Sequence, residues 1–202
     1  MQGPIGMEKT IGGGKDFVET LRRGLSVDEP VVSEKDRQAC VAVIIVRGED
    51  GFSVLMIKRA ERDGDAWSGQ MAFPGGKREK EDRSYSATAE RETLEEVGID
   101  LAQGARFIGY MEPRKTKTGS IVVVPSVFVL DRKVEARPNE EVASFVWVPV
   151  RELSRPENST TYRDGKEGAV QDMPAVAVGG HVVWGLTYEI IGDMLRGWVG
   201  GS

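Results

Sequence analysis

Three glutamates follow an arginine within little more than one turn of a predicted helix: Arg91, Glu92, Glu95 and Glu96. At about 100° of rotation per residue, the three carboxylates fall within an arc of roughly 100° and point the same way. Like charges this close repel by a few tenths of a kcal/mol per pair, and a divalent cation is the simplest compensation. An oxygen-only ligand set favours Mg²⁺ or Mn²⁺ over zinc. The spacing therefore predicts a metal site.

The alternative is a solvated, glutamate-rich helix face that carries no chemistry, and on the glutamates alone both interpretations stand. The preceding residues 73–76, Phe-Pro-Gly-Gly, favour the metal site. Proline fixes one φ there, and two glycines permit a positive φ and a close backbone approach, as in a turn. Such a turn can hold loop amides beside the carboxylates. A face of small residues would let the helix sit close to a sheet, with Gly98 ending it; these residues are Ser86, Ala89 and Thr93, with Val97.

This segment resembles the Nudix box, the signature of hydrolases that act on a nucleoside diphosphate linked to another group. The resemblance is carried by Gly76, Arg91, Glu92, Glu95, Glu96, Gly98 and Ile99. Compared with the family pattern, one extra residue lies between the first glycine and the arginine, and Asp82 replaces the first glutamate. A lengthened box of this kind resembles the coenzyme A diphosphatase branch of the family.

Two upstream segments are similar to the same branch. Residues 55–60 read LMIKRA and residues 69–76 read GQMAFPGG, which looks like a motif running from an arginine near a strand end into a GQxxFPGG turn. Where the branch usually has an arginine or histidine between the two halves, residues 63–68 read DGDAWS, and Arg62 is out of register. Residues 183–187, VWGLT, also resemble a segment of that branch, one that introduces its last helix.

The resemblance implies a role for each residue of the box. Glu92 and Glu96 are the principal metal ligands, Glu95 is a ligand or positions the attacking water, and Arg91 orients a glutamate through a salt bridge. Gly76 adds a backbone carbonyl to the metal site, with Gly75 as the alternative donor. The alternative for Arg91 is a purely structural i,i+4 pair with Glu95.

Phosphate binding is predicted for a small set of residues near the box. Forked or point-charge donors suit phosphate oxygens, although a solvated strand-end cation is the alternative for Arg59. The candidate substrate-binding residues are Lys58, Arg59, Arg78 and Gly75.

Glu140 and Glu141 follow Pro138 and Asn139 just before a predicted strand. Nudix enzymes often place another acidic residue near the metals at this point, so the resemblance implies that one of the two is a further ligand or the general base. An exposed acidic turn is the alternative. Four aromatic side chains are candidates for stacking on a base, with core packing as the alternative for each: Trp67, Tyr162, His181 and Trp184.

Composition excludes several other classes of function. A net charge of −5 without a long basic cluster argues against nucleic acid as the main partner. The single cysteine, Cys40, and the single histidine, His181, exclude a disulfide within the chain and a zinc site of the usual kind, and they argue against a Cys-His dyad. No apolar run approaches the ~18 residues of a membrane span, and the start lacks a basic region followed by an apolar stretch. The expected location is the cytoplasm, and no membrane partner is expected.

Hydrophobic periodicity predicts alternating helices and strands. Helices are expected at residues 16–25 and 187–195, besides the acidic one. Strands are expected at 39–46, 52–57, 106–112, 121–130 and 144–148, with a hairpin turn at Asp50-Gly51 and a solvated loop at 113–120. Residues 1–14 are glycine-rich and expected to be disordered.

This order predicts an α+β fold, and the resemblance implies a Nudix-type α/β/α sandwich with a mixed β-sheet. Residues 1–30 are expected to be a flexible N-terminus with one short helix, which caps the domain or mediates a homodimer, and 31–202 the Nudix domain. The resemblance implies Mg²⁺- or Mn²⁺-dependent hydrolysis of a diphosphate in a small-molecule nucleotide, with coenzyme A or acyl-coenzyme A favoured. ADP-ribose, NADH, a nucleoside triphosphate, or a nucleotide sensor without hydrolysis are the alternatives.

Overall fold

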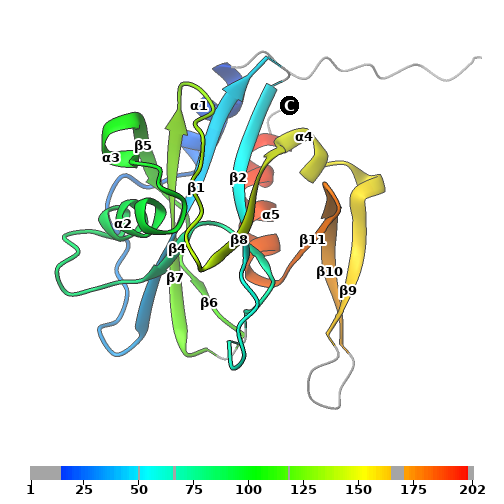
Figure 1. The fold of residues 1–202 in the computed structure, drawn as a ribbon. Helices are drawn as coiled ribbons and strands as arrows, with labels where there is room; N and C mark the ends of the chain where they lie inside the picture. The colour runs from blue at the N-terminus through cyan, green and yellow to red at the C-terminus, as the bar shows by residue number, and fades with distance from the viewer. Residues whose placement is uncertain (1–14, 50, 66, 118, 165–170, 200–202) are drawn as a thin grey trace, which may run out of the picture.

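The structure is a computed structural model that describes residues 15–49, 51–65, 67–117, 119–164 and 171–199. Figure 1 shows the elements along the chain. They are α1 (Lys15–Arg23), β1 (Arg37–Gly48), β2 (Gly51–Arg59), β3 (Met71–Ala72), β4 (Gly75–Lys77), α2 (Tyr85–Val97), α3 (Leu101–Gly104), β5 (Ala105–Tyr110), β6 (Arg114–Lys115), β7 (Ile121–Leu130), β8 (Val142–Pro149), α4 (Val150–Leu153), the 3₁₀ turn η1 (Pro156–Asn158), β9 (Ser159–Asp164), β10 (Gln171–Val178), β11 (His181–Trp184) and α5 (Gly185–Val199).

The main sheet is mixed, as predicted. Its strand order is β3-β2-β1-β7-β5, and β4, β6 and β8 pair with β1, β7 and β2 respectively. β1 and β7 run parallel to each other, whereas every other pair in this sheet is antiparallel. Gly48 pairs with Gly51, which confirms the predicted hairpin between β1 and β2; Asp50 lies outside the described residues.

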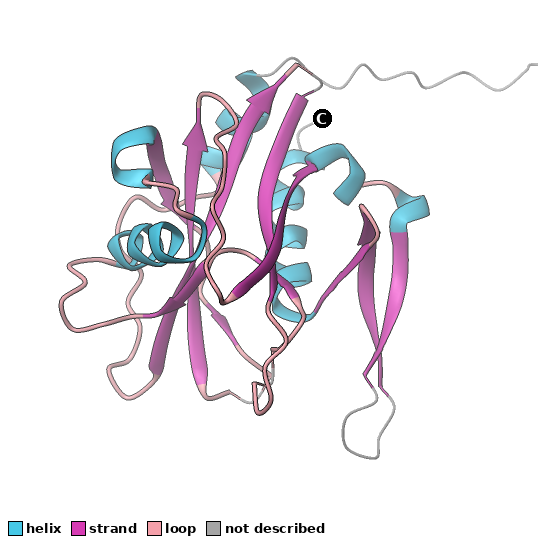
Figure 2. Cartoon of the chain, in the orientation of Figure 1, coloured by secondary structure: helices cyan, strands magenta, loops and turns pink. Residues whose placement is uncertain are grey.

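Helices cover both faces of this sheet, with α2 and α3 on one side and α1 and α5 on the other (Figures 1 and 2). Successive residues of β1 therefore enter different cores: Val43 and Ile45 pack in the cluster with α1 and α5, while Ala42 and Ile44 pack in the cluster with α2. A strand buried on both faces needs an unbroken apolar sequence, which explains the run at 39–46. The predicted α/β/α sandwich is confirmed.

The predicted N-terminal helix is present as α1 and belongs to the same core. Phe17 and Leu21 are buried in the cluster shared with α5, and the Phe17 ring lies 5.0 Å from that of Phe52 on β2. The predicted disorder of residues 1–14 falls outside the described residues. Among the described helices, none combines the length and hydropathy that crossing a membrane requires.

Three regions differ from the predicted elements. The loop expected at 113–120 contains the short strand β6, and Gly75 and Gly76 of the expected turn belong to β4. A separate sheet of order β11-β10-β9, seen beside the main sheet in Figure 1, was not predicted at all. Two- and three-residue strands have no periodicity to detect, and β9 reads STTYRD, without apolar alternation.

Candidate active site on the acidic helix

The acidic side chains are carried by α2, whose two ends are defined by its sequence. The Ser84 hydroxyl accepts a hydrogen bond from the Ala87 amide at 3.0 Å, capping the N-terminus. At the other end Gly98 adopts φ 68°, and its amide donates to the Leu94 carbonyl at 3.0 Å. Ala89, with Thr93 and Val97, is fully buried towards the sheet, so the opposite side of α2 is left to the charged residues. The predicted helix and its end are confirmed.

Arg91 is the centre of a charged network. Its Nη1 donates to Glu92 at 3.0 Å and to Glu95 at 3.3 Å. Its Nε and Nη2 each donate to one oxygen of Asp82 at 3.1 Å, and Nη2 also donates to the Lys77 carbonyl at 3.0 Å. The structure therefore brings together the predicted salt bridges to the glutamates, and the i,i+4 pair with Glu95 is one part of a larger set.

Asp82 forms a forked pair with Arg91. Its Oδ2 also accepts hydrogen bonds from the Glu79 amide and the Thr88 hydroxyl, both at 2.9 Å. Burial raises the pKa of Asp82, but the hydrogen bonds from Arg91, Glu79 and Thr88 together outweigh it and lower the pKa overall. The ionised Asp82 therefore holds Nε and Nη2 of Arg91, while Nη1 of Arg91 bonds to the glutamates.

Glu96 is the most buried of the three glutamates, with 3% of its surface exposed. Its Oε2 accepts a hydrogen bond from the Gly75 amide at 2.8 Å, which joins α2 to β4. Desolvation by burial raises the pKa of Glu96 to about 7, and burial also raises the pKa of Glu92. Because burial disfavours the ionised forms of Glu92 and Glu96, a nearby positive charge would stabilise both carboxylates.

The backbone of β4 leaves little space beside these carboxylates. A Cβ placed on Gly76 would lie 2.5 Å from Cδ of Glu92. Within the described residues, no three His, Cys, Asp or Glu side chains already converge as a metal-binding group, and Glu92 and Glu95 bond to Arg91. The donor set consists of oxygens, and burial disfavours the ionised forms of Glu92 and Glu96 by raising the pKa of each. Glu92 and Glu96, with Glu95 beside them, therefore fit a divalent cation of the Mg²⁺ type.

Glu141 lies close to this group, and the Glu140 carboxylate lies 3.9 Å from the same Arg62 that pairs with Glu141. The negative charge of Glu141 contributes to the raised pKa values of Glu92 and Glu96. The Glu141 carbonyl accepts from the Ala60 amide at 2.8 Å, and its carboxylate pairs with Arg62 at 3.2 Å. The Glu140 side chain is 90% exposed. Sequence reasoning missed Arg62, since nothing local signals a contact 79 residues away.

Arg59 and Trp67 are held by one carboxylate. Asp65 accepts from Nη2 of Arg59 and from the Trp67 amide, each at 2.9 Å. The Nε of Arg59 is buried and has no hydrogen-bond partner among the described residues, and the Arg59 charge acts to lower the pKa of Glu96. Arg59 therefore has a donor available next to the carboxylates.

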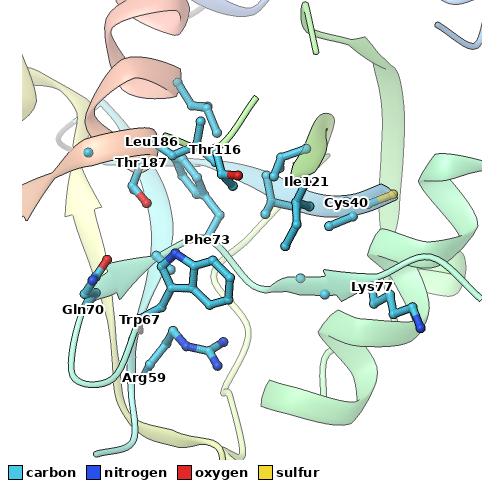
Figure 3. Close-up of a pocket in the computed structure, with 18 of the residues that line it drawn as sticks. Cys40, Arg59, Trp67, Gln70, Phe73, Lys77, Thr116, Ile121, Leu186 and Thr187 are labelled. Carbon is cyan, nitrogen blue, oxygen red and sulfur yellow. The ribbon is translucent and has the colours of Figure 1, made fainter. Parts of the chain in front are cut away.

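A cavity of about 460 Å³ adjoins Gly75 and Gly76 (Figure 3). Of the predicted substrate-binding residues, Arg59 and Gly75 line it, while Lys58 does not. Arg78 borders a different hollow, where it pairs with Glu29 at 3.7 Å and lies over the Tyr85 ring. Lining residues that sequence reasoning missed come from β1, the 113–120 segment and α5, including Arg37, Thr116, Lys117, Leu186, Thr187 and Ile190.

Two of the four candidate aromatic residues line this cavity, Trp67 and Trp184. Trp67 is 44% exposed, and Figure 3 shows its indole directed towards the cavity. Tyr162 stacks on Trp184 with ring centroids 4.2 Å apart and an interplanar angle of 6°. His181 does not line the cavity. Trp67 is thus the candidate with the most exposed ring.

Replacing Arg91 by lysine is expected to lower turnover at least tenfold, because a single ammonium cannot hold Asp82 with a fork and reach Glu92 as well. Substrate KM should change less than kcat, since the carboxylates are misplaced while the cavity is intact. Arg163→Lys, at an exposed ion pair with Asp172, is the matched control and should leave turnover unchanged. Equal kinetics in both variants would contradict this role for Arg91.

Comparison with known proteins identifies the family. The sequence model of the NUDIX domain matches residues 36–168. The uncharacterized Nudix hydrolase NudL of Photorhabdus laumondii is 31% identical, over 90% of this chain and 95% of that protein. The uncharacterized protein C14C4.10c of Schizosaccharomyces pombe is 43% identical over 61% of this chain; that match spans only 45% of the relative's length.

A solved MutT/nudix family protein from Enterococcus faecalis has the same fold, with a TM-score of 0.55 and 17% identity over 94% of this chain and 70% of that one. Nudix hydrolases cleave the pyrophosphate bond of nucleoside diphosphate derivatives and generally use divalent metal ions such as Mg²⁺ or Mn²⁺. The matched residues contain the Arg91 network and its glutamates, and this chain is a hydrolase of the Nudix family.

Proposed function

We propose that this hydrolase cleaves the diphosphate of coenzyme A or an acyl-coenzyme A, releasing 3′,5′-ADP and a 4′-phosphopantetheine product. The observation that carries the proposal is the position of the cavity. Gly75 and Gly76 separate it from Glu96 and Glu92, and its walls are largely apolar. Its volume suits a small-molecule ligand. Coenzyme A has a diphosphate with a larger group on each side. The diphosphate would lie at the glutamates of α2, and the cavity next to Gly75 and Gly76 has space for a flanking group.

The chain's own residues have distinct parts in this reaction. Glu92 and Glu96 would hold the metal, and Glu95 would be a further ligand or orient the attacking water. When bound, Mg²⁺ or Mn²⁺ neutralises the phosphate oxygens and lowers the pKa of a coordinated water. Arg91 keeps the glutamates in place, and the guanidinium of Arg59, which lines the cavity, donates to a phosphate oxygen.

Glu141 is the proposed general base or additional ligand, and Glu140 is not. Glu141→Gln is expected to lower kcat by about 10²-fold, the ordinary contribution of a positioned base. Glu140→Gln should change kcat less than twofold, because this side chain is 90% exposed. Steady-state kinetics with saturating Mg²⁺ compares the two. Equal effects would remove Glu141 from the reaction.

Mass spectrometry of the products tests the substrate. The panel contains coenzyme A, acetyl-coenzyme A, ADP-ribose, NADH and nucleoside triphosphates, each with Mg²⁺, with Mn²⁺ and with chelator. Metal-dependent release of 3′,5′-ADP is the expected result. Release of another nucleoside monophosphate would keep the chemistry and replace the substrate. No product from any compound, with ligands still raising the melting temperature, would favour a nucleotide sensor instead.

A further inference from the structure

Besides Arg59, three cations line the cavity and lie near one end of the main sheet: Arg37 on β1, Lys77 on β4, and Lys117 just after β6. The strands bring them together. Ala39 pairs with Lys77, Arg37 pairs with Ile121, and the Thr116 amide donates to the Ile121 carbonyl at 2.9 Å. Strand residues two apart share a face, so Arg37 lies on the same face as Ala39 and Lys77.

These cations are not neutralised by the protein. Within the part of the chain that the structure describes, none of the three forms an ion pair with a carboxylate. Asp36, the acidic neighbour of Arg37, pairs with Lys115 at 3.3 Å, and the side chain of Lys117 contacts the sulfur of Met173. Three unpaired positive charges at one cavity favour an anionic ligand.

Lys77 is offset along β4 from Gly75, the residue that contacts Glu96. Lys77 is two residues after Gly75 along β4, which corresponds to about 7 Å of extended chain. The Gly75 amide is hydrogen-bonded to Glu96, so the cleaved diphosphate belongs beside Gly75, whereas Lys77 lines the cavity further along β4. In Figure 3, Arg59 and Trp67 lie on one side of the cavity and Lys77 on the other. A distance of this size is comparable to one ribose.

We propose that Arg37, Lys77 and Lys117 form a subsite for a phosphomonoester of the substrate, distinct from the diphosphate that is hydrolysed. This inference rests on the proposed function, and it deepens it: of the compounds in the panel, coenzyme A and its thioesters carry a phosphate monoester on the ribose. A phosphomonoester has a charge near −2 at neutral pH and three acceptor oxygens, which suit one guanidinium and two ammonium groups.

The test compares coenzyme A with 3′-dephospho-coenzyme A in wild type, Arg37→Ala and Lys117→Ala. In wild type, kcat/KM is expected to be about tenfold or more higher for coenzyme A than for 3′-dephospho-coenzyme A. The dephospho substrate lacks the phosphate and so loses its charge-assisted hydrogen bonds to the subsite. Each variant should lose this preference through a higher KM for coenzyme A, with its kinetics on the dephospho substrate unchanged. Arg132→Ala, at an exposed position away from the cavity, is the control and should keep the preference.

Equal losses on both substrates would overturn the subsite, because they would mean that the cations attract any polyanion. A wild type without preference would overturn it as well. If neither substrate is cleaved, the proposed function fails, and calorimetric binding of 3′,5′-ADP and 5′-AMP still tests the subsite. The subsite predicts that wild type binds 3′,5′-ADP more tightly than 5′-AMP, and that Arg37→Ala abolishes this difference. Equal affinities of wild type for the two nucleotides would overturn the subsite.

Discussion

Glu96→Gln is expected to lower turnover by about 100-fold or more while the fold is retained. The substitution removes a ligand charge from the proposed metal site, although the amide oxygen can still accept from the Gly75 amide. Single-turnover hydrolysis at saturating Mg²⁺ measures the loss, and circular dichroism checks the fold. Leu94→Gln, on an exposed position of the same helix, is the control and should leave turnover unchanged. Wild-type turnover in Glu96→Gln would show that the metal site is misplaced.

Without metal, Glu96→Gln is expected to raise stability at high pH, although it lowers turnover. Burial raises the pKa of Glu96 from 4.5 to about 7, so the folded state binds this proton more tightly than the unfolded chain. The resulting stabilisation is fully present below pH 4.5 and is lost as pH rises through 7, amounting to about 3 kcal/mol. In chelator, Glu96→Gln should therefore raise Tm relative to wild type at pH 8 and change it little at pH 4.5. A Tm lowered equally at both pH values would contradict this account.

Gly75→Ala is expected to lower the free energy of unfolding by about 3 kcal/mol or more. A Cβ at this position would lie 2.1 Å from the Cys40 carbonyl oxygen and 2.6 Å from Cα of Val41, and the residue has φ 153°. Backbone atoms of β1 cannot move aside without breaking the pairing with β4, so overpacking and backbone strain add. Urea unfolding measures the loss.

Two other glycine substitutions separate this effect from a general effect of alanine. Gly192→Ala in α5 meets no atom within 4 Å and should raise stability by up to about 1 kcal/mol, since alanine favours helix. Gly76→Ala would contact the carboxylate of Glu92, the end of a side chain, so it should impair turnover more than stability. Equal stabilities of the Gly75 and Gly192 variants would mean that β4 is not closely packed against β1.

The sequence determined the features that rest on local rules. Helical spacing placed Glu92, Glu95 and Glu96 on one side of α2, and glycine at position 98 ends that helix because it adopts a positive φ without strain. The apolar run at 39–46 predicted the strand β1, and the structure shows why it is apolar throughout, since it is buried on both faces. The same local pattern carried the resemblance to the family, which the comparison confirmed.

Only the tertiary structure decided which distant residues meet at the site. Arg62 reaches Glu141 across 79 positions, and Arg37, Lys77 and Lys117 share a cavity because four strands align their ends. Glu96 faces the amide of Gly75 because β4 pairs with β1. The two glycines of β4 give no sequence signal that predicts this pairing. Such contacts depend on strand order and register, and these are set by the burial of the whole core rather than by any short stretch of residues.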